Sequence, residues 1–185
     1  MIDNKILKFE SPARIAELNP METLKRAGLN EKMTVCDIGA GTGVFAFPAA
    51  EITDNTVYAL DISDGMIELL ERRKTERGIE NLQIRKVVSS DLPVENNAVD
   101  LIIMVTVLHE IEDKVSLFAE IRRILRAEGK MMVIEFHKKE TPMGPPVDHR
   151  ISEDSVEEIL EKEGFDIEDK VLLGENFYGI VASLR

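Results

Sequence analysis

Three glycines at alternate positions close an apolar run at residues 35–44, which read VCDIGAGTGV. Glycine has no Cβ, so it adopts turns that other residues avoid and lets a bound molecule touch the main chain. Gly39, Gly41 and Gly43 lie between a predicted strand and a predicted helix and therefore indicate a cofactor-binding loop; a tight turn without a ligand is the alternative. The spacing is not that of a dinucleotide-binding loop, G-x-G-x-x-G, because Val44 stands where that pattern has its third glycine.

A carboxylate closes the next apolar run, residues 56–61 (TVYALD), about 20 residues beyond the glycines. An acid at this strand end can accept hydrogen bonds from the hydroxyls of a ribose, so Asp61 indicates a cofactor that carries a nucleoside. The alternative is that Asp61 caps the following helix, but Ser63 and Asp64 are better placed for that role.

With both features present, the chain resembles the class I S-adenosylmethionine-dependent methyltransferases, whose first motif, apolar-apolar-Asp-apolar-Gly-x-Gly-x-Gly, is matched from Val35 to Gly43. It is similar to the small ubiquinone and menaquinone biosynthesis branch of that family. The resemblance implies S-adenosyl-L-methionine as cofactor, S-adenosyl-L-homocysteine as product, and an unidentified small-molecule methyl acceptor. It places the methionine moiety beside the glycine loop with Asp37 near its ammonium group; a carboxylate that only stabilises the loop is the alternative for Asp37. It places Met66 on the adenine side, against the alternative of plain core packing. Ile62 follows Asp61 and can pack on the adenine face.

The predicted cofactor-binding residues lie around the ends of the first four strands and are Asp37, Gly39, Ala40, Gly41, Asp61, Ile62, Met66, Ser89, Ser90 and Val105. The third strand departs from the family pattern, because Val88 stands where many relatives have an acid. Ser89, Ser90 or their backbone can then accept a hydrogen bond from the adenine amino group. Asp91 takes this role if the alignment shifts. An ordinary turn accounts for the two serines equally well.

A histidine and a carboxylate follow the fourth strand at His109 and Glu110, close to where the resemblance puts the methyl donor. A histidine of ordinary pKa, about 6.5, can take a proton from an attacking oxygen or nitrogen, so His109 is a candidate base or substrate contact. Packing at a helix start is the alternative. Arg150 is a candidate contact for a substrate carboxylate, against the alternative of a solvated side chain.

His137 follows the fifth strand and His149 follows a proline-rich loop, so the three histidines of the chain could converge on one mouth. Their spacings lack the short pairs of familiar metal sites. We therefore predict no metal and expect histidines that are solvated or that line the substrate site.

Apolar runs alternate with amphipathic stretches, which is typical of a parallel sheet covered by helices on both faces. The expected strands span residues 33–38, 56–61, 82–88, 98–105, 129–136, 165–173 and 176–184. Only Gly174 and Glu175 separate the last two, so these must pair antiparallel. We predict an α/β Rossmann-like fold, a doubly wound seven-stranded sheet that is mostly parallel with an antiparallel C-terminal strand, as the resemblance also implies.

The clearest helix spans residues 113–126, where apolar side chains recur at helical spacing, and Gly129 should end it. Asn19 and Pro20 predict the start of a short helix, and Ser155–Glu158 has the capping-box form that starts or reinforces the last one. In such a fold ligands bind outside the carboxyl ends of the strands, here where the first strand meets the fourth.

Length and composition, 185 residues with 44% hydrophobic, favour one domain over residues 1–185, with 1–28 as an N-terminal helical cap or lid and 29–185 as the core. Residues 2–18 would fold over the mouth as the lid; packing on the sheet edge is the alternative. The formal net charge of −12 at pH 7 argues against nucleic acid as a partner. The single Cys36 permits no disulfide, and no stretch reaches the ~20 apolar residues of a membrane span, so we expect a cytoplasmic location.

Two other functions compete with methyl transfer. A non-catalytic S-adenosylmethionine or nucleoside-binding module would keep Gly39, Gly41 and Asp61 and tolerate changes at His109 and Arg150. A nicotinamide-dependent oxidoreductase is disfavoured by Val44 and by the terminal hairpin. Neither the acceptor nor the oligomeric state follows from the sequence.

Overall fold

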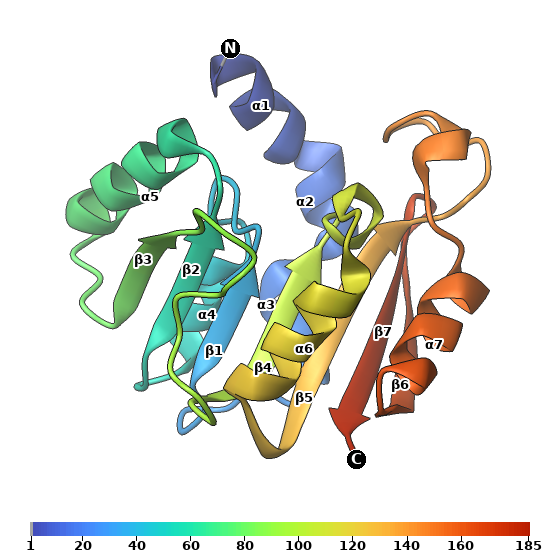
Figure 1. The fold of residues 1–185 in the computed structure, drawn as a ribbon. Helices are drawn as coiled ribbons and strands as arrows, with labels where there is room; N and C mark the ends of the chain where they lie inside the picture. Colours follow the sequence, from blue (N-terminus) through green and yellow to red (C-terminus); the bar gives the residue numbers. More distant parts are fainter. Residues whose placement is uncertain (1) are drawn as a thin grey trace.

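The computed structural model describes residues 2–185, which fold around one seven-stranded sheet (Figure 1). The strands lie in the order β3-β2-β1-β4-β5-β7-β6. Their bounds are Val35–Ile38 (β1), Val57–Asp61 (β2), Leu82–Lys86 (β3), Val99–Val105 (β4), Leu125–Phe136 (β5), Phe165–Leu173 (β6) and Phe177–Leu184 (β7). β1 to β5 pair in parallel, whereas β7 lies antiparallel between β5 and β6. This arrangement confirms the predicted fold class.

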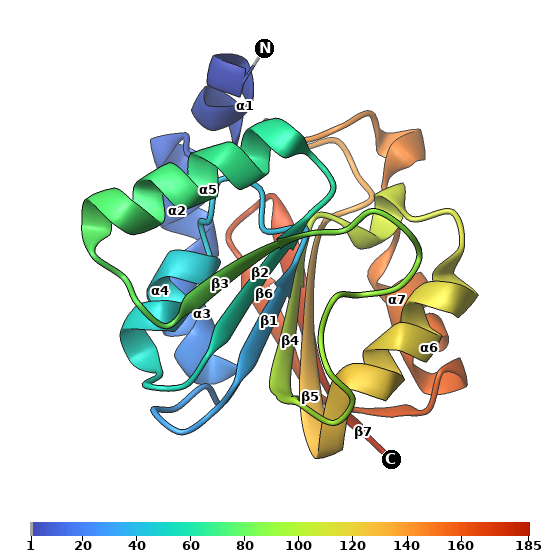
Figure 2. The same ribbon diagram turned by 60° about the vertical axis from the view of Figure 1, so that its left-hand side comes forward.

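Helices cover both faces of the sheet, with α3, α4 and α5 on one face and α6 and α7 on the other (Figure 2). Their bounds are Ile2–Phe9 (α1), Pro12–Leu18 (α2), Pro20–Arg26 (α3), Ala46–Ile52 (α4), Asp64–Arg77 (α5), Lys114–Ile124 (α6) and Glu153–Lys162 (α7), with short 3₁₀ turns at Leu108–Glu110 (η1) and Val147–His149 (η2). Of the described helices, none has the length and apolar character needed to cross a membrane.

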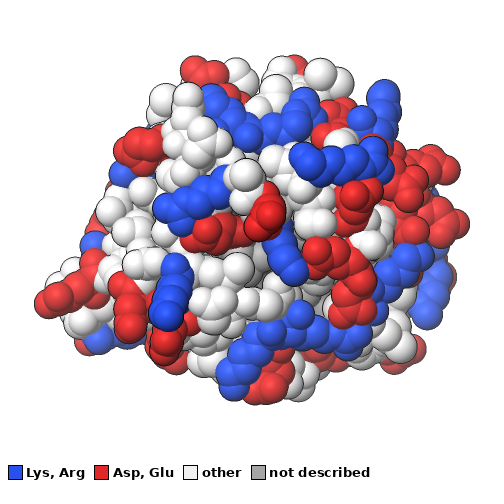
Figure 3. Space-filling view, turned by 90° about the horizontal axis from the view of Figure 1, so that it is seen from below, with Lys and Arg blue, Asp and Glu red and all other residues white. Residues whose placement is uncertain are grey.

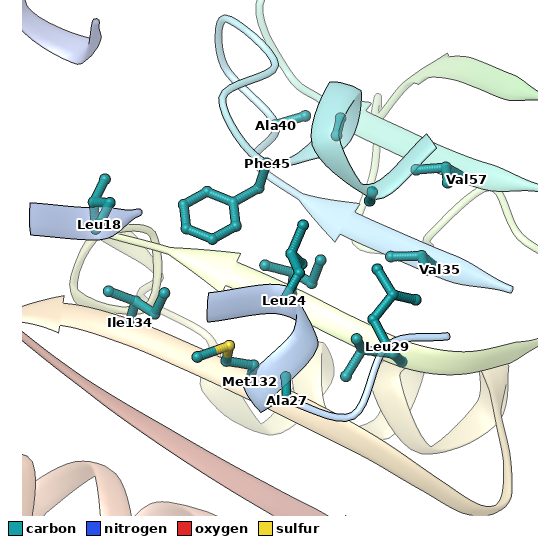
Figure 4. Packing of buried hydrophobic residues seen from close by; sticks show 14 of the residues in the cluster. Leu18, Leu24, Ala27, Leu29, Val35, Ala40, Phe45, Val57, Met132 and Ile134 are labelled. Atoms are coloured by element: carbon teal, nitrogen blue, oxygen red, sulfur yellow. The ribbon is translucent and has the colours of Figure 1, made fainter. Parts of the chain in front are cut away.

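The segment from α2 to α3 belongs to the hydrophobic core. Leu18 and Leu24 are fully buried, and they pack with Val35 of β1 and Ile134 of β5 in one cluster (Figure 4). Burying two leucines removes apolar surface that would cost several kcal/mol to leave in water. Of the helices within residues 1–28, α2 and α3 thus contribute to the core, whereas none of the described residues of α1 belongs to either hydrophobic cluster.

The end of α6 differs from the prediction. The helix stops at Ile124, and neither its expected extension to Arg126 nor a stop at Gly129 is correct. Leu125 has an extended backbone and pairs with Val99 of β4, so the chain passes directly from α6 into β5. Leu125 is buried and also continues the apolar spacing of α6, so hydrophobic spacing alone cannot distinguish the last helical turn from the first strand residue.

The start of α7 differs from the prediction, whereas the start of α3 and the terminal hairpin agree with it. Ser152, and not Ser155, caps α7, because the Ser152 hydroxyl accepts a hydrogen bond from the Ser155 N–H at 3.3 Å. Asn19 does precede α3 as predicted, although it also ends α2 in the left-handed conformation and its side chain makes no capping bond. The terminal hairpin is confirmed, with Gly174 at a φ of +66° in its turn.

The carboxyl ends of β1, β2 and β4 meet at one edge of the sheet, and α1 lies beyond that edge (Figure 1). β1 separates β2 from β4, which makes this edge the predicted point where strand order reverses. The face at the opposite end of the strands carries basic and acidic side chains interspersed (Figure 3). That face therefore lacks the continuous basic surface that binding to a phosphate backbone requires.

Candidate active site

A cavity of about 680 Å³ opens at the carboxyl ends of β1, β2 and β4. This volume is typical of a site for a small molecule. The structure brings His109 and all the predicted cofactor-binding residues to its walls: Asp37, Gly39, Ala40, Gly41, Asp61, Ile62, Met66, Ser89, Ser90 and Val105. Arg150 does not line the cavity.

Asp61 shapes the glycine loop. Its Oδ2 accepts a hydrogen bond from the Gly41 N–H at 2.9 Å, and its Oδ1 accepts one from the Ser63 N–H at 2.9 Å. The second bond shows that Asp61 also supports the start of α5, which is part of the helix-capping role considered as the alternative for this residue. A carboxylate offers about four lone-pair positions, and these two bonds leave acceptor positions for a ligand.

Gly39 and Gly43, the first and last of the three glycines, have different roles. Gly39 faces the cavity at a φ of +74°, and a Cβ there would lie 2.5 Å from Cγ2 of Val107. Gly43 lies outside the cavity lining, and a Cβ there would lie 2.4 Å from the Phe47 ring of α4. Gly39 therefore allows β4 and the loop to approach, whereas Gly43 allows α4 to pack.

Asp37 is a buried carboxyl group beside the loop. Burial, together with the nearby charge of Asp61, raises the pKa of Asp37 to about 7, against the opposing effect of a hydrogen bond from the Ala46 backbone. Among the ion pairs formed by the described side chains, none involves Asp37 or Asp61. The two acids therefore form a negative centre that a bound cation would neutralise.

The wall beyond β2 and β3 is apolar and partly open. Met66 is buried, whereas Ile62 is 76% exposed although it lines the cavity. Ser89 and Ser90 reach the lining, but Val88 is exposed and lies outside it. The Ser89 hydroxyl also accepts a hydrogen bond from the Asp91 N–H at 3.2 Å, so the two serines form a turn and a cavity wall at once.

His109 is held by a carboxylate that the sequence analysis did not identify. Its Nδ1 lies 2.7 Å from Oε2 of Glu135, and its backbone N–H donates to Oε1 of the same residue at 3.2 Å. The hydrogen bond to Glu135 raises the pKa of His109 against the opposing effect of burial. Because Nδ1 donates to the carboxylate, Nε2 of the neutral ring is free to accept a proton.

Arg14 lines the cavity and was likewise not identified by the sequence analysis. It lies in the first turn of α2 and is only 6% exposed, and its Nη2 donates to Oγ1 of Thr106 at 3.0 Å. Burial lowers the pKa of Arg14 to about 10, and the charge of Glu135 opposes that shift. Arg14 thus remains a cation at neutral pH, enclosed mainly by apolar groups.

The structure places Arg150 elsewhere, contrary to its predicted substrate role. The guanidinium is buried and donates to the backbone oxygens of Pro145, His137 and Lys139 at 2.8 to 2.9 Å, and to Oγ1 of Thr141. Arg150 therefore organises the proline-rich loop. Its buried position also excludes the solvated alternative.

The three histidines do not converge. Only His109 lines the cavity; His149 is exposed, and the His137 ring packs at 5.5 Å from the Tyr178 ring. Burial lowers the pKa of His137. Among residues 2–185, no group of three histidine, cysteine or acidic side chains is arranged to hold a metal ion.

One of the two missed residues had a sequence signal. Glu135 interrupts the apolar run 131–136 (MMVIEF) at the end of a strand, which is the same signal that identified Asp61. No feature of the sequence identified Arg14, because its position in the cavity depends on contact with the distant Thr106 and on burial by other elements.

Comparisons with known proteins agree with this geometry. The profile of a family described as a methyltransferase domain matches residues 29–178. The crystal structure of an S-adenosylmethionine-dependent methyltransferase from Aquifex aeolicus superposes with a TM-score of 0.92, at 29% identity over 98% of both chains.

Curated relatives carry a more specific name. Ubiquinone/menaquinone biosynthesis C-methyltransferases from Bordetella avium and Francisella philomiragia are 30% and 27% identical to the chain, over 68% and 66% of its length. The matched region covers 50% of each relative. The chain therefore spans about half the length of the curated relatives it matches.

Proposed function

The chain belongs to the methyltransferase domain family, and from that premise we propose that it transfers the methyl group of S-adenosylmethionine to a small-molecule acceptor. One observation supports this proposal above the others. Asp37 and Asp61 lie beside a glycine loop in a cavity of about 680 Å³ and have no cationic partner among the described side chains. A ligand with an ammonium group and a sulfonium would supply the missing positive charge.

The residues present fit this cofactor. Asp61 retains acceptor positions for a ribose diol, while Ile62 and Met66 offer an apolar face to an adenine. Asp37 offers a carboxylate to the ammonium group of a methionine moiety, beside the exposed backbone of Gly39 and Gly41. Exposure of 76% at Ile62 is expected for a side chain whose partner is a ligand.

Methyl transfer requires mainly that the acceptor and the methyl group are held in the correct relative position. When bound, S-adenosylmethionine supplies a methyl group on a cationic sulfur that leaves as a neutral thioether once the acceptor forms its bond to the methyl carbon. The protein aligns the acceptor with that carbon and excludes water, which accounts for much of the acceleration in such reactions. His109 lies on the acceptor side of the cavity, where Nε2 can take the proton that an oxygen or nitrogen acceptor loses.

Calorimetric titration with S-adenosylmethionine, S-adenosylhomocysteine and NAD tests the cofactor assignment. We expect micromolar binding of the first two and a roughly tenfold or larger weakening by Asp61→Asn, because a charged hydrogen-bond acceptor is lost. Asp64→Asn is the matched control, since Asp64 is exposed, lies three residues further along and does not line the cavity. Binding of NAD alone, or equal loss in both variants, would overturn the assignment.

The His109–Glu135 pair yields a separate prediction. NMR titration of the imidazole should give a His109 pKa above 6.5, and Glu135→Gln should lower it, because the neutral amide no longer stabilises the imidazolium. The stabilising contribution of the pair is then present below pH 6.5 and is lost as the pH rises through the raised pKa.

If the His109 pKa is unchanged in Glu135→Gln, the carboxylate does not tune the base. The acidic limb of the pH–rate profile should follow the His109 pKa once an acceptor is known.

A further inference from the structure

Arg14 is a buried cation that the cofactor assignment leaves without a partner. It is 6% exposed, and the one hydrogen bond that its guanidinium makes among the described residues is the one that Nη2 donates to Oγ1 of Thr106. Its Nε is fully buried and has no hydrogen-bond partner within residues 2–185. An enclosed guanidinium with an unmet donor is costly unless a ligand completes its bonding.

Three aromatic rings lie around the guanidinium of Arg14, and two of them, Phe9 and Phe136, line the cavity. The guanidinium carbon lies 5.0 Å from the centre of the Phe177 ring, 5.4 Å from that of Phe136 and 5.8 Å from that of Phe9. Such rings stabilise a cation and hold its plane. Ion pairs between described side chains do not include Arg14, although Glu135 is near enough to affect its pKa.

Thr106 adds a sign of strain at the same place. It is a β-branched residue at a φ of +55°, directly after β4. This conformation is rare for threonine and costs of order 1–3 kcal/mol, so the surrounding structure must enforce it. Its hydroxyl is thereby fixed where it accepts from Arg14, and its N–H donates to the Ile134 oxygen of β5 at 2.7 Å.

The position of Arg14 separates it from the cofactor-binding acids. Asp61 and Asp37 close β2 and β1, whereas Arg14 touches the ends of β4 and β5 and the start of β7. Across the sheet, β4, β5 and β7 continue away from β1 on the side opposite β2. A cofactor held by Asp61, the glycine loop and Asp37 leaves this part of the cavity to the acceptor.

We propose that Arg14 binds a carboxylate of the acceptor and that the acceptor is a flat, aromatic or conjugated organic acid. A guanidinium presents two parallel N–H donors that match a carboxylate, and the neighbouring aromatic rings suit a planar molecule. Lys8 of α1 also lines the cavity and adds positive charge on the acceptor side, near enough to His109 to oppose its protonation. This inference rests on the proposed function, because it assigns to the acceptor the part of the cavity that the proposed cofactor leaves open.

The test compares 4-fluorobenzoate with 4-fluorobenzamide, which differ in charge and not in shape. Binding of each to the protein saturated with S-adenosylhomocysteine is followed by fluorine NMR. We expect the acid to bind about tenfold or more tightly than the amide, because a charged hydrogen bond is gained. Arg14→Gln should abolish this preference, and Arg14→Lys should retain part of it, since lysine keeps the charge but loses the paired donors.

Lys25→Gln is the matched control, because it removes an exposed positive charge on α3, outside the cavity lining. It should leave the preference unchanged. The inference fails if the wild-type protein binds acid and amide equally or if Arg14→Gln keeps the preference. It also fails if Arg14→Gln weakens S-adenosylhomocysteine more than tenfold, since Arg14 would then serve the cofactor. Absence of S-adenosylhomocysteine binding by the wild-type protein would instead refute the proposed function.

Discussion

Asp37 must change its protonation state when a cationic ligand binds beside it. Its pKa of about 7 means that near neutral pH the carboxyl is partly protonated, and an ammonium group next to it would stabilise the ionised form. Binding should therefore release a proton. We predict that S-adenosylhomocysteine binds about tenfold more tightly at pH 8 than at pH 6, as linkage to a group of this pKa requires.

The measurement is calorimetry at several pH values in buffers of different ionisation enthalpy. Asp37→Asn, which cannot ionise, should give a weaker affinity with a flatter pH dependence and less proton release. His109 also titrates in this range, so a dependence that persists unchanged in Asp37→Asn would assign the proton to His109 and refute the role of Asp37.

The chemistry at single residues could be predicted where it followed from strand ends. Asp61 was identified because a carboxylate that closes an apolar run in a parallel sheet lies at the ligand-binding edge, whereas Asp37 was identified from the family resemblance; the structure brings both to the cavity. Glu135 obeys the same rule. Arg14 could not be assigned, because its place in the cavity depends on a contact with the distant Thr106. Arg150 could not be assigned either, because the way the preceding loop folds back onto its guanidinium does not follow from residue types.

At the scale of elements, the glycine loop connects the cavity to α4, and Gly43 is the loop residue that packs against this helix. Gly43→Ala would force a β-carbon to within 2.4 Å of the Phe47 ring at a φ of +86°. Strain of this kind and overpacking each cost roughly 1–3 kcal/mol, so we predict a loss of about 2–5 kcal/mol in the free energy of unfolding. Urea denaturation measures it.

Gly28→Ala provides the comparison, because its φ of +89° is similar but no atom lies within 4 Å of an added Cβ. Gly28→Ala should lower the free energy of unfolding by about 1–2 kcal/mol, the cost of placing alanine in the left-handed backbone conformation. Equal losses in the two variants would show that packing of α4 against the loop does not limit stability.

The elements were predictable wherever pairing and periodicity agreed. Six of the seven strands start and end within two residues of their predicted bounds, and β5 starts four residues earlier than predicted. The passage from α6 to β5 was mispredicted because Leu125 satisfies both a helical stripe and a buried strand. Its pairing with Val99, across 26 residues of sequence, decides between them.

At the scale of the whole molecule, α1 lies beyond the carboxyl ends of the strands (Figure 1), and its described residues line the cavity but belong to neither hydrophobic cluster. Lys5, Lys8 and Phe9 line the cavity from α1, which has 8 residues and is too short to be stable alone. Its C-terminal side is held by Arg73, whose Nη1 donates to Glu10 at 2.5 Å and to the Thr42 oxygen of the glycine loop at 2.8 Å. This pair connects α1 to the part of the loop that a cofactor would touch.

We predict that α1 acts as a cover whose order depends on the ligand. In hydrogen exchange, amides of residues 2–9 should exchange rapidly in the free protein and become protected with S-adenosylhomocysteine, while β4 and β5 change little. Glu10→Gln should reduce that protection and speed ligand release, because the link through Arg73 to the loop is weakened; Lys25→Gln should do neither. If α1 is equally protected with and without ligand, it is a fixed wall of the cavity and access must lie elsewhere.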